Sequence, residues 1–443
     1  MKSKSNLGEN PAATILNRRR LLQFLAASPV IAGKAKDLMA AEGEYVPSAR
    51  AEDPYIWKPY DPNFLLEKAE DALDVFDFEA TAHKNMIASF SQTHWGFMST
   101  GADSEDTYRA NRHDMSKFVI RSRRLRGFPD KEVDTTRTMF GTKWSQPFFI
   151  CPTGRNGAYH AEGEVGVGKA AGKHNVMQCL ATNSTFGIPE VNKARGNGTP
   201  VVFQLYQQGN FEHSKALLAR AEREGCKAVM LTVDGVSSRK DMQFARQQRD
   251  DKKLCLTCHT IRPGGKPTAV QLSSKIDGNF KEFTEEMYNQ KFTPDSMTWD
   301  WPKRVRDVTK MDIFIKGITD VEDALMCIKL GYGIHVSNHG GRNEDTGRST
   351  INSLSQIAPA VKGRAPIFVD SGFRRGMDIV KALAMGATMV GFGRPYIWGL
   401  GAFGADGVDK VISILKAETL AAMQQVGAGS VKELTPDLIQ RAL

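Results

Sequence analysis

Eight short apolar runs, most of them separated by one helical segment, constrain the fold of this 443-residue chain more than any other feature. They lie at 146–154, 175–183, 200–207, 226–234, 312–318, 333–341, 365–372 and 387–395. Continuous apolar strands joined by helices are typical of a parallel sheet covered on both faces. Eight such units predict an α/β protein with a closed (β/α)8 TIM barrel, and an open doubly wound sheet is the alternative.

The segments around these runs divide the chain into three parts. We expect a leader at 1–45, an N-terminal helical segment at 46–140 and the barrel at 141–443, with closing helices from 404. The connection at 236–304 is polar, shows little periodicity and is far longer than ordinary loops. Because it follows the fourth run, we expect a lid at the catalytic mouth of the barrel.

The leader contains a basic stretch directly before a short apolar segment, "NRRRLLQFLAASPVIAG" at 17–33. The apolar segment is too short to span a bilayer and has the form of a secretory signal. Arg18 to Arg20 resemble a twin-arginine export signal, which implies a periplasmic or exported protein folded around its cofactor. The alternative is a basic amphipathic helix on a cytoplasmic or membrane-associated protein.

The charge of the chain argues against a nucleic-acid partner. Its 59 basic and 50 acidic residues give a net charge of +9, which is modest for this length. The basic residues form no long block beyond 18–20 and 121–126. This pattern supports at most a weak attraction to anionic substrates or membrane surfaces.

Six cysteines are too few for a disulfide framework in a chain of this size. Cys255, Cys258 and His259 in "CLTCH" match the pattern of covalent haem attachment. Haem is attached to unfolded chains, however, whereas the leader suits export of a folded protein. We therefore favour free thiols over a Cys255–Cys258 disulfide, and either of these over haem; no metal site is expected.

Polar residues follow the apolar runs at the point where each run ends. In a barrel of this kind, the carboxyl ends of the strands carry the chemistry. The residues there include Pro152, Thr153, Gly154, Gln204, Tyr206, Thr232, Asp234, Lys316, Ser337, His339, Arg342, Asp370, Gly372, Gly393 and Arg394. Each has a simpler explanation, such as a helix cap for Asp234, but their recurrence at successive strand ends favours a functional site.

The last two strand ends predict a phosphate site, which barrels commonly place after strands 7 and 8. Gly372 and Gly393 let backbone N–H groups approach a ligand. Arg374 and Arg394 supply positive charge for a phosphate.

At these residues the chain resembles the FMN-dependent 2-hydroxy acid oxidases and dehydrogenases. The family pattern is Ser-Asn-His-Gly-Gly/Ala-Arg, then Asp-Gly-Gly-x-Arg-x-Gly, then Gly-Arg-Pro. This chain has 337–342, 370–376 with serine at 371, and 393–395, and the resemblance spans roughly 90–435. It implies FMN-dependent oxidation of a 2-hydroxy acid, or a related hydroxyl-bearing substrate, to the 2-oxo product. The alternative is a flavin, or flavin and haem, electron-transfer protein without hydroxy acid turnover.

The resemblance also implies roles for individual residues. His339 would be the base, Asp234 would orient its ring, Tyr206 would bind the substrate oxygen, Arg342 the substrate carboxylate, and Lys316 would lie beside the flavin. An imidazole suits a base because its ordinary pKa lies near working pH. Flavin-lining residues would be Pro152, Thr153, Gly154, Gln204, Thr232 and Ser337, with Asp370 on the ribityl chain and Gly372, Arg374, Gly393 and Arg394 on the phosphate.

The chain departs from the family where a substrate carboxylate would bind. Phe97 stands in place of a tyrosine, and Asp241 in place of a second arginine. Arg155 follows Gly154, where relatives carry an apolar residue. Arg155, Arg239 or Lys240 would have to replace the missing contacts, or else the substrate is not a simple 2-hydroxy acid.

The resemblance leaves the electron acceptor and the assembly open. Gly154, where many relatives have alanine, favours a dehydrogenase over an oxidase. An exported dehydrogenase would pass electrons to a quinone or a cytochrome. The family also implies a homo-oligomer, commonly a tetramer.

Overall fold

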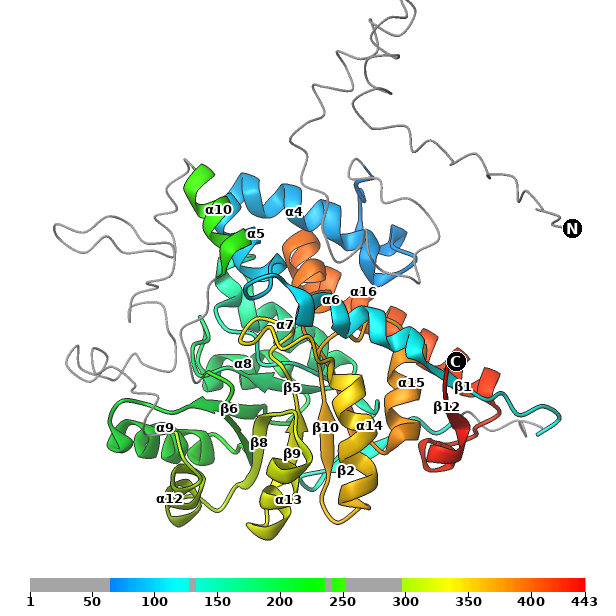
Figure 1. The fold of residues 1–443 in the computed structure, drawn as a ribbon. Coiled ribbons are helices and arrows are strands. Elements are labelled where there is room, and N and C mark those ends of the chain that lie inside the picture. The colour runs from blue at the N-terminus through cyan, green and yellow to red at the C-terminus, as the bar shows by residue number, and fades with distance from the viewer. Residues whose placement is uncertain (1–63, 127–132, 236–240, 252–296, 443) are drawn as a thin grey trace, which may run out of the picture. The chain divides into compact units, whose positions relative to one another are not determined.

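Eight parallel strands close into a barrel in the computed structural model, which describes residues 64–126, 133–235, 241–251 and 297–442 (Figure 1). The strands are β4 (Phe148–Ile150), β5 (Met177–Leu180), β6 (Val202–Tyr206), β7 (Ala228–Thr232), β8 (Asp312–Ile318), β9 (Gly333–Val336), β10 (Ile367–Val369) and β11 (Met389–Phe392). β11 pairs with β4 and closes the ring. The predicted (β/α)8 barrel is confirmed, and the open sheet is wrong.

Helices surround the barrel and return the chain from one strand to the next. They are α7 (Gly163–Lys173), α8 (Ile188–Arg195), α9 (Phe211–Arg223), α12 (Asp300–Val308), α13 (Val321–Lys329), α14 (Thr350–Val361), α15 (Gly376–Met385) and α16 (Arg394–Val426). Asn210, Asp320 and Ser349 each accept a hydrogen bond from a backbone N–H of the first turn of α9, α13 and α14. Such caps satisfy donors that the helix itself leaves unpaired, so they fix where each helix begins.

Side chains that alternate along the strands fill the barrel and then form its upper rim. Phe314 lies in the buried interior of the barrel. Because side chains two positions apart share a face of a strand, Lys316 follows Phe314 on the inner side, one layer nearer the carboxyl end. The same parity relates Phe368 to Asp370 and Met230 to Thr232. Along each of these strands, an apolar side chain of the core and a polar side chain of the site are therefore only two residues apart.

The segments outside the barrel contain strands as well as the predicted helices. The N-terminal elements are η1 (Ala69–Asp71), η2 (Val75–Asp77), α4 (Phe78–Ser89), α5 (Gln92–Ser99), α6 (Asp106–His113) and η3 (Asp114–Lys117), then β1 (Phe118–Ile120), β2 (Arg137–Met139) and β3 (Thr142–Trp144). η4 (Asn156–Ala158) lies between β4 and α7, and α16 is followed by η7 (Val431–Glu433), η8 (Pro436–Leu438) and β12 (Ile439–Arg441). Helices were expected at 46–140 and from 404 onward; within the described residues both segments contain them, and the strands β1, β2, β3 and β12 were not predicted.

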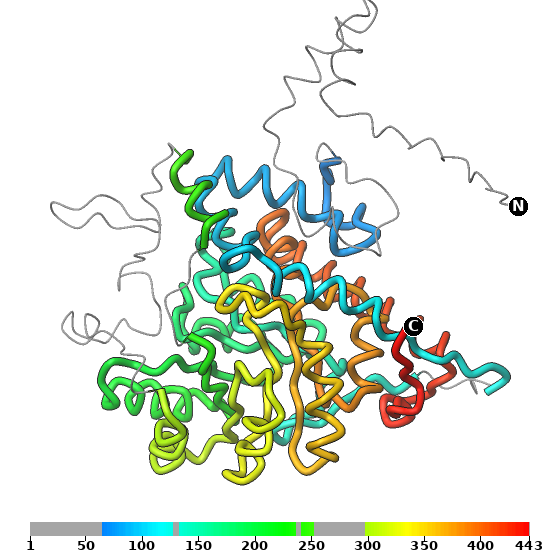
Figure 2. Tube along the Cα trace, viewed as in Figure 1, coloured from blue at the N-terminus to red at the C-terminus, as the bar shows by residue number. Residues whose placement is uncertain are grey.

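Segments far apart in the sequence lie side by side around the barrel (Figure 2). β1 pairs antiparallel with β12 near the C-terminus, and α4 contacts α16. Phe140, in the turn between β2 and β3, packs against Phe314 and Phe368, with ring centroids 5.4 and 6.1 Å apart. This hairpin covers the barrel end opposite the site.

The long connection after β7 contains a helix that the sequence pattern did not reveal. α10 (Met242–Asp250) lies against α5, where Gln92 donates to Gln247 at 3.0 Å and Phe97 meets Phe244 edge-on at 5.7 Å. The rest of the predicted lid that precedes Met297 lies outside the described residues. Asp241 and α10 are therefore anchored to the N-terminal segment.

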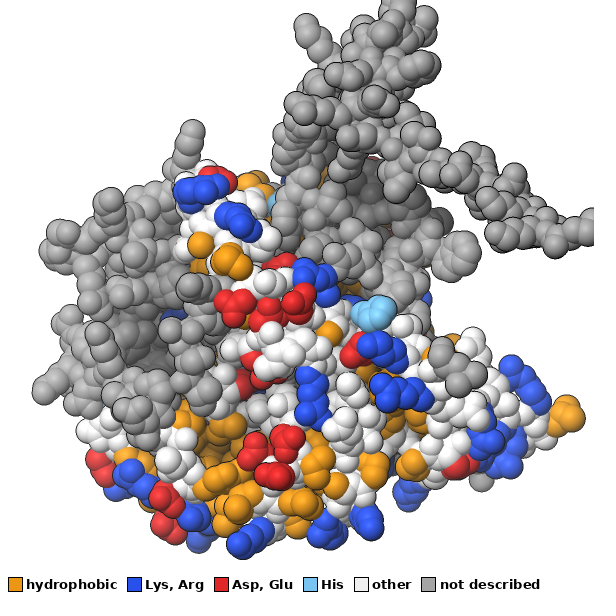
Figure 3. Space-filling view, in the orientation of Figure 1, with side chains coloured by type: hydrophobic (Ala, Val, Ile, Leu, Met, Phe, Trp, Pro, Cys, Tyr) orange, Lys and Arg blue, Asp and Glu red, His pale blue; other side chains and the backbone are white. Residues whose placement is uncertain are grey.

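The described surface mixes charges of both signs. On the face in Figure 3, Lys and Arg side chains are interspersed with Asp and Glu, and hydrophobic side chains gather toward the lower edge, where α12 and α13 lie in Figure 1. Among the described helices, none has the length and apolar character that a membrane crossing requires.

Candidate active site

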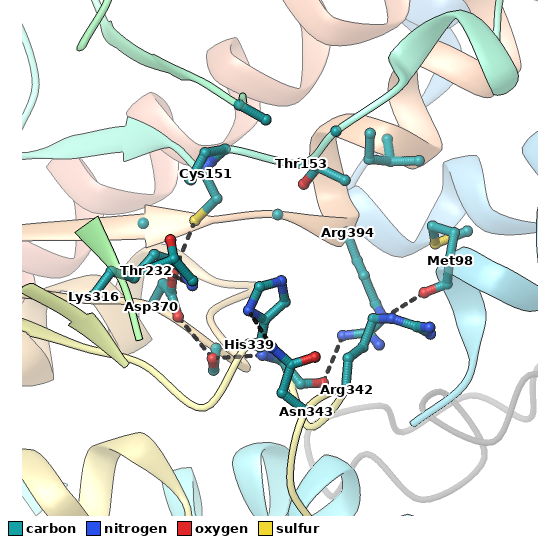
Figure 4. A pocket seen from close by; sticks show the side chains of 18 of the residues that line it. Met98, Cys151, Thr153, Thr232, Lys316, His339, Arg342, Asn343, Asp370 and Arg394 are labelled. Carbon is teal, nitrogen blue, oxygen red and sulfur yellow. Dashed lines mark hydrogen bonds and ion pairs between the residues drawn. The ribbon is translucent and has the colours of Figure 1, made fainter. Parts of the chain in front are cut away.

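A cavity of about 480 Å³ lies at the carboxyl ends of the barrel strands, where the sequence placed the site. It lies in the range of about 300–1,000 Å³ that encloses cofactor-sized ligands. Its lining includes the predicted Phe97, Pro152, Thr153, Gly154, Arg155, Tyr206, Thr232, Lys316, His339, Arg342, Asp370, Gly372, Arg374, Gly393 and Arg394. Figure 4 shows residues from several strand ends facing this space. The barrel thus gathers side chains that are up to about 300 residues apart in sequence.

His339 stands at the centre of the cavity wall, held by neighbours on both ring nitrogens. Its Nδ1 lies 3.0 and 3.1 Å from the two carboxylate oxygens of Asp234, and its Nε2 lies 3.3 Å from the hydroxyl of Tyr206. The backbone of His339 is left-handed, with φ 57°. Strained backbone of this kind tends to occur at functional sites, because the surrounding structure must hold it.

The electrostatics of this pair suit a base. Burial lowers the pKa of His339 below its ordinary 6.5, although the Asp234 carboxylate partly opposes the shift. Burial alone would raise the pKa of Asp234, but His339 and Lys316 together hold it well below its ordinary 3.8. At neutral pH the imidazole is therefore neutral and able to take a proton, while Asp234 is ionised and able to stabilise the charge that results.

Asn343 is a part of this group that the sequence reasoning missed. Its side-chain amide donates to Asp234 at 2.8 Å and lies 3.0 Å from Nδ1 of His339. The signal was available, because Asn343 directly follows Arg342 in the stretch that carries His339. Asn343 fixes the carboxylate that in turn orients the ring.

Lys316 lies between two carboxylates at the base of the cavity. Its Nζ is 3.8 Å from Asp234 and 4.0 Å from Asp370, and it donates to Ser337 at 3.0 Å. Burial would lower the pKa of this amine, but the two carboxylates raise it above its ordinary 10.5. The site therefore keeps a fixed positive charge at this position.

His335 extends this network into the barrel core and was not predicted. Its Nε2 lies 3.0 Å from Oδ2 of Asp370, and its ring meets Phe149 edge-on at 5.5 Å. Burial lowers the pKa of His335, whereas Lys316 and His335 outweigh burial to hold the pKa of Asp370 far below 3.8. A neutral ring beside an ionised carboxylate implies that Nε2 carries the proton.

The predicted carboxylate clamp has a different construction from the family pattern. The guanidinium of Arg342 lies over the ring of Phe97, 4.3 Å from its centroid, and donates to the carbonyl of Thr100 at 3.0 Å. Asp241 lies 3.6 Å from Nη2 of Arg342. Phe97 therefore supports the arginine through its ring face, and Asp241 pairs with the charge of the arginine. Arg155 also lines the cavity, from a left-handed position with φ 57°.

Two predicted flavin contacts lie behind the cavity wall. The amide of Gln204 donates to Thr232 at 2.8 Å and accepts from the backbone of Thr182 at 3.1 Å. Ser337 accepts from Lys316 and from the backbone N–H of His339. Both residues position side chains that line the cavity.

The predicted phosphate residues border the same cavity. Gly393 caps the N-terminus of α16, where backbone N–H groups and the helix dipole favour an anion. Gly372 has φ 90°, and a Cβ there would collide with the carbonyl of Asn111 on α6. Arg374 lies over Trp398, and Arg394 donates to the carbonyls of Met98, Thr100 and Gly340, which ties α5 to the loop that carries His339.

These features fit FMN. One end of the cavity offers a helix N-terminus and two arginines for a phosphate, and Asp370 offers a carboxylate for hydroxyl groups. Gly154 also lines the cavity, and a Cβ there would lie 3.0 Å from the carbonyl of Asn183, so the glycine lets the backbones that follow β4 and β5 approach closely. Lys316 supplies a buried positive charge for a ring system that gains electrons.

Some predictions fall outside the described residues. Arg239 and Lys240, the leader at 1–45 and the motif of Cys255, Cys258 and His259 belong to this group. Within the described part of the chain, no group of three or more His, Cys, Asp or Glu side chains is arranged to hold a metal ion.

Comparison with known proteins gives one family. The model of the FMN-dependent dehydrogenase family matches residues 87–441. The chain is 33% identical to 2-hydroxyacid oxidase 2 of Rattus norvegicus over 82% of this chain and 97% of that protein. It is 34% identical to L-lactate oxidase of Lysinibacillus sphaericus (strain C3-41) over 77% of this chain and 86% of that protein. Among solved structures, it is similar to the recombinant flavin-binding domain of baker's yeast flavocytochrome b2, with a TM-score of 0.71 and 27% identity. The match covers 84% of this chain and 87% of that domain.

Proposed function

The chain belongs to the FMN-dependent dehydrogenase family and is an FMN enzyme that oxidises 2-hydroxy acids, and we propose that His339 is the base of this reaction. FMN, when bound, accepts the two electrons released by the substrate. The alternative, an electron-transfer protein without turnover, is not favoured, because the relatives above are named as oxidases.

The geometry around His339 supports this role. Nε2 faces the cavity beside the hydroxyl of Tyr206, while Nδ1 is held by Asp234. A proton taken at Nε2 would give an imidazolium whose second N–H points at an ionised carboxylate. Tyr206 would bind the substrate oxygen, and Lys316 would stabilise negative charge that develops deeper in the cavity.

The acyl end of the substrate would lie beside Arg342, whose guanidinium packs over Phe97 of α5. Arg342 and Arg155 both line the cavity and can donate hydrogen bonds to the acyl end of a 2-hydroxy acid. Placing that end at Arg342 leaves the hydroxyl-bearing carbon near His339, since both residues belong to one loop after β9.

The observation that carries the proposal is the contact of His339 with Asp234 at the wall of a cofactor-sized cavity. The experiment is anaerobic mixing of the purified, FMN-loaded protein with lactate, glycolate and mandelate. Loss of the flavin absorbance with at least one compound supports the proposal. A flavin that stays oxidised with the whole panel opposes it.

We propose further that the electrons leave to a quinone or a cytochrome rather than to oxygen. Gly154 at the flavin position and the likeness to flavocytochrome b2 support this acceptor class. Readmitting air to the bleached protein tests it. Slow return of the yellow colour, with rapid return on adding a quinone or cytochrome c, is the expected result, and return within the mixing time would contradict it.

Export through the twin-arginine route and assembly into a homo-oligomer complete the proposal. The basic and apolar character of 17–33 supports export. Fractionation of expressing cells, with Arg18 and Arg19 both changed to lysine as the control, tests the first point. Light scattering of the purified protein tests the second.

A further inference from the structure

Asp241 occupies the N-cap position of α10 without capping the helix through its side chain. An aspartate at this position ordinarily accepts a hydrogen bond from a backbone N–H of the first helical turn. Asp241 makes no such bond, and its carboxylate instead lies 3.6 Å from Nη2 of Arg342 in the cavity wall. The contact joins the start of α10 to the loop that carries His339.

Contacts within the described residues hold Asp241 in this place. Phe244, one turn along α10, makes an edge-to-face contact with Phe97, and the ring of Phe97 supports Arg342. At the far end of α10, Asp251 accepts from the backbone N–H and the hydroxyl of Thr93, at 2.8 and 2.7 Å. The position of the carboxylate is therefore set by the docking of α10 on α5.

The pair is largely shielded from water. The exposed fractions of the side chains are 10% for Arg342 and 16% for Asp241. Charges in such surroundings are weakly screened, so the carboxylate offsets much of the attraction that Arg342 would exert on a second anion. A substrate carboxylate at Arg342 would also face Asp241 as a like charge.

We propose that Asp241 determines substrate specificity by converting an anion site into a site for an uncharged acyl group, that of a 2-hydroxy carboxamide. This inference rests on the proposed function of the same cavity. A guanidinium beside a carboxylate presents a donor next to an acceptor. A primary amide matches both, because its carbonyl accepts from Arg342 and its NH2 group donates to Asp241. The bonds that change at the hydroxyl-bearing carbon are those of the established oxidation.

The experiment uses the full-length, FMN-loaded protein and two matched pairs, lactate with lactamide and mandelate with mandelamide. Dissociation constants come from the change in the flavin spectrum on binding, and rates from anaerobic flavin reduction. The variants are Asp241→Asn and Asp250→Asn. Asp250 carries the same charge on the same helix but is exposed and pairs with Arg249 at 2.9 Å, so it serves as the control.

We expect the amides to reduce the flavin of the wild type at least as efficiently as the acids do. Asp241→Asn should tighten binding of the acids about tenfold or more and change binding of the amides by less than about threefold. Asp250→Asn should change the binding of neither the acids nor the amides. Equal effects of Asp241→Asn on both members of a pair, or weaker acid binding, would overturn the proposal.

The outcome for the proposed function is separate. If no acid and no amide reduces the flavin, the proposed function fails, while the spectral dissociation constants still decide the role of Asp241. If Asp241→Asn does not retain FMN, the wild type decides: reduction by acids but not by amides refutes the proposal, and efficient reduction by amides supports it.

Discussion

Both carboxylate oxygens of Asp234 lie within 3.1 Å of Nδ1 of His339, although 105 residues separate the two in the chain. Asp234 follows β7 and His339 follows β9, and β8 with Lys316 lies between them. The barrel therefore builds an acid–base pair by placing strand ends side by side.

Replacing Asp234 with asparagine should slow flavin reduction about 10²–10⁴-fold, because the imidazolium that forms would lose its counter-charge and the ring its orientation. Stopped-flow absorbance under nitrogen measures the rate. FMN content should remain near that of the wild type, since Asp234 contacts His339, Asn343 and Lys316 but is not among the residues that line the cavity. A rate within threefold of the wild type would refute the role.

The pH profile provides a second test of His339. A base must be neutral, so kcat/KM should fall only as the pH drops below the pKa of His339, which burial holds below 6.5. Asp234 opposes that shift, so Asp234→Asn should move the acid limb to still lower pH while lowering the plateau. An acid limb above pH 7 in the wild type would contradict this assignment.

Lys316 should control how easily the flavin is reduced. Lys316→Met removes the positive charge between Asp234 and Asp370 and leaves two buried carboxylates facing each other. We expect a lower flavin reduction potential and a rate of flavin reduction lower by about 10²-fold or more. Titration against a reference dye measures the potential. Lys316→Arg, which keeps the charge, is the matched control, and equal potentials in all three proteins would exclude the role.

A buried ion pair outside the cavity should support the phosphate end of the site. Arg112 on α6 lies 2.7 Å from Asp378 on α15, and the exposed fractions of their side chains are 5% and 2%. Arg112→Met would leave the carboxylate unpaired and should lower the free energy of unfolding by about 3–5 kcal/mol. Urea unfolding of the FMN-loaded protein measures the change, with the exposed Arg249→Met as the control.

The pH dependence of that stability has a defined sign. Burial would raise the pKa of Asp378, but Arg112 and two backbone N–H groups lower it below 3.8. A carboxylate with a depressed pKa in the folded state stabilises the protein above its unfolded-state pKa and loses that effect as the pH falls. The difference in the free energy of unfolding between the wild type and Arg112→Met should therefore shrink below about pH 4. A constant difference from pH 7 to pH 3 would count against the pair.

The sequence was sufficient to predict the barrel and the placement of the main site residues. Continuous apolar runs specify buried parallel strands, and the carboxyl ends of such strands converge on one face. His339 and Asp234 could be expected to meet because each follows its run directly. Lys316 and Asp370 follow from strand parity, which places them one step above Phe314 and Phe368.

The parts that were missed depend on contacts with no local signal. Asp241 meets Arg342 only because α10 docks on α5 through Phe244, and Phe244 is the one buried residue of this short, polar helix, so the connection carried little apolar signal. The sequence places His335 inside a buried strand but does not show its partner. Its contact with Asp370 depends on the pairing of β9 with β10. The β2–β3 hairpin, at the other end of the barrel, is too short to stand out from its flanking loops.

Comparing flavin reduction in the wild type and in His339→Ala is the most direct test of whether His339 is the base. Both proteins are loaded with FMN and mixed without oxygen with the hydroxy compound that the wild type uses best. We expect complete bleaching of the wild type and a rate at least about 10³-fold lower in His339→Ala, at equal FMN content. Bleaching of both proteins at the same rate would show that His339 is not the base.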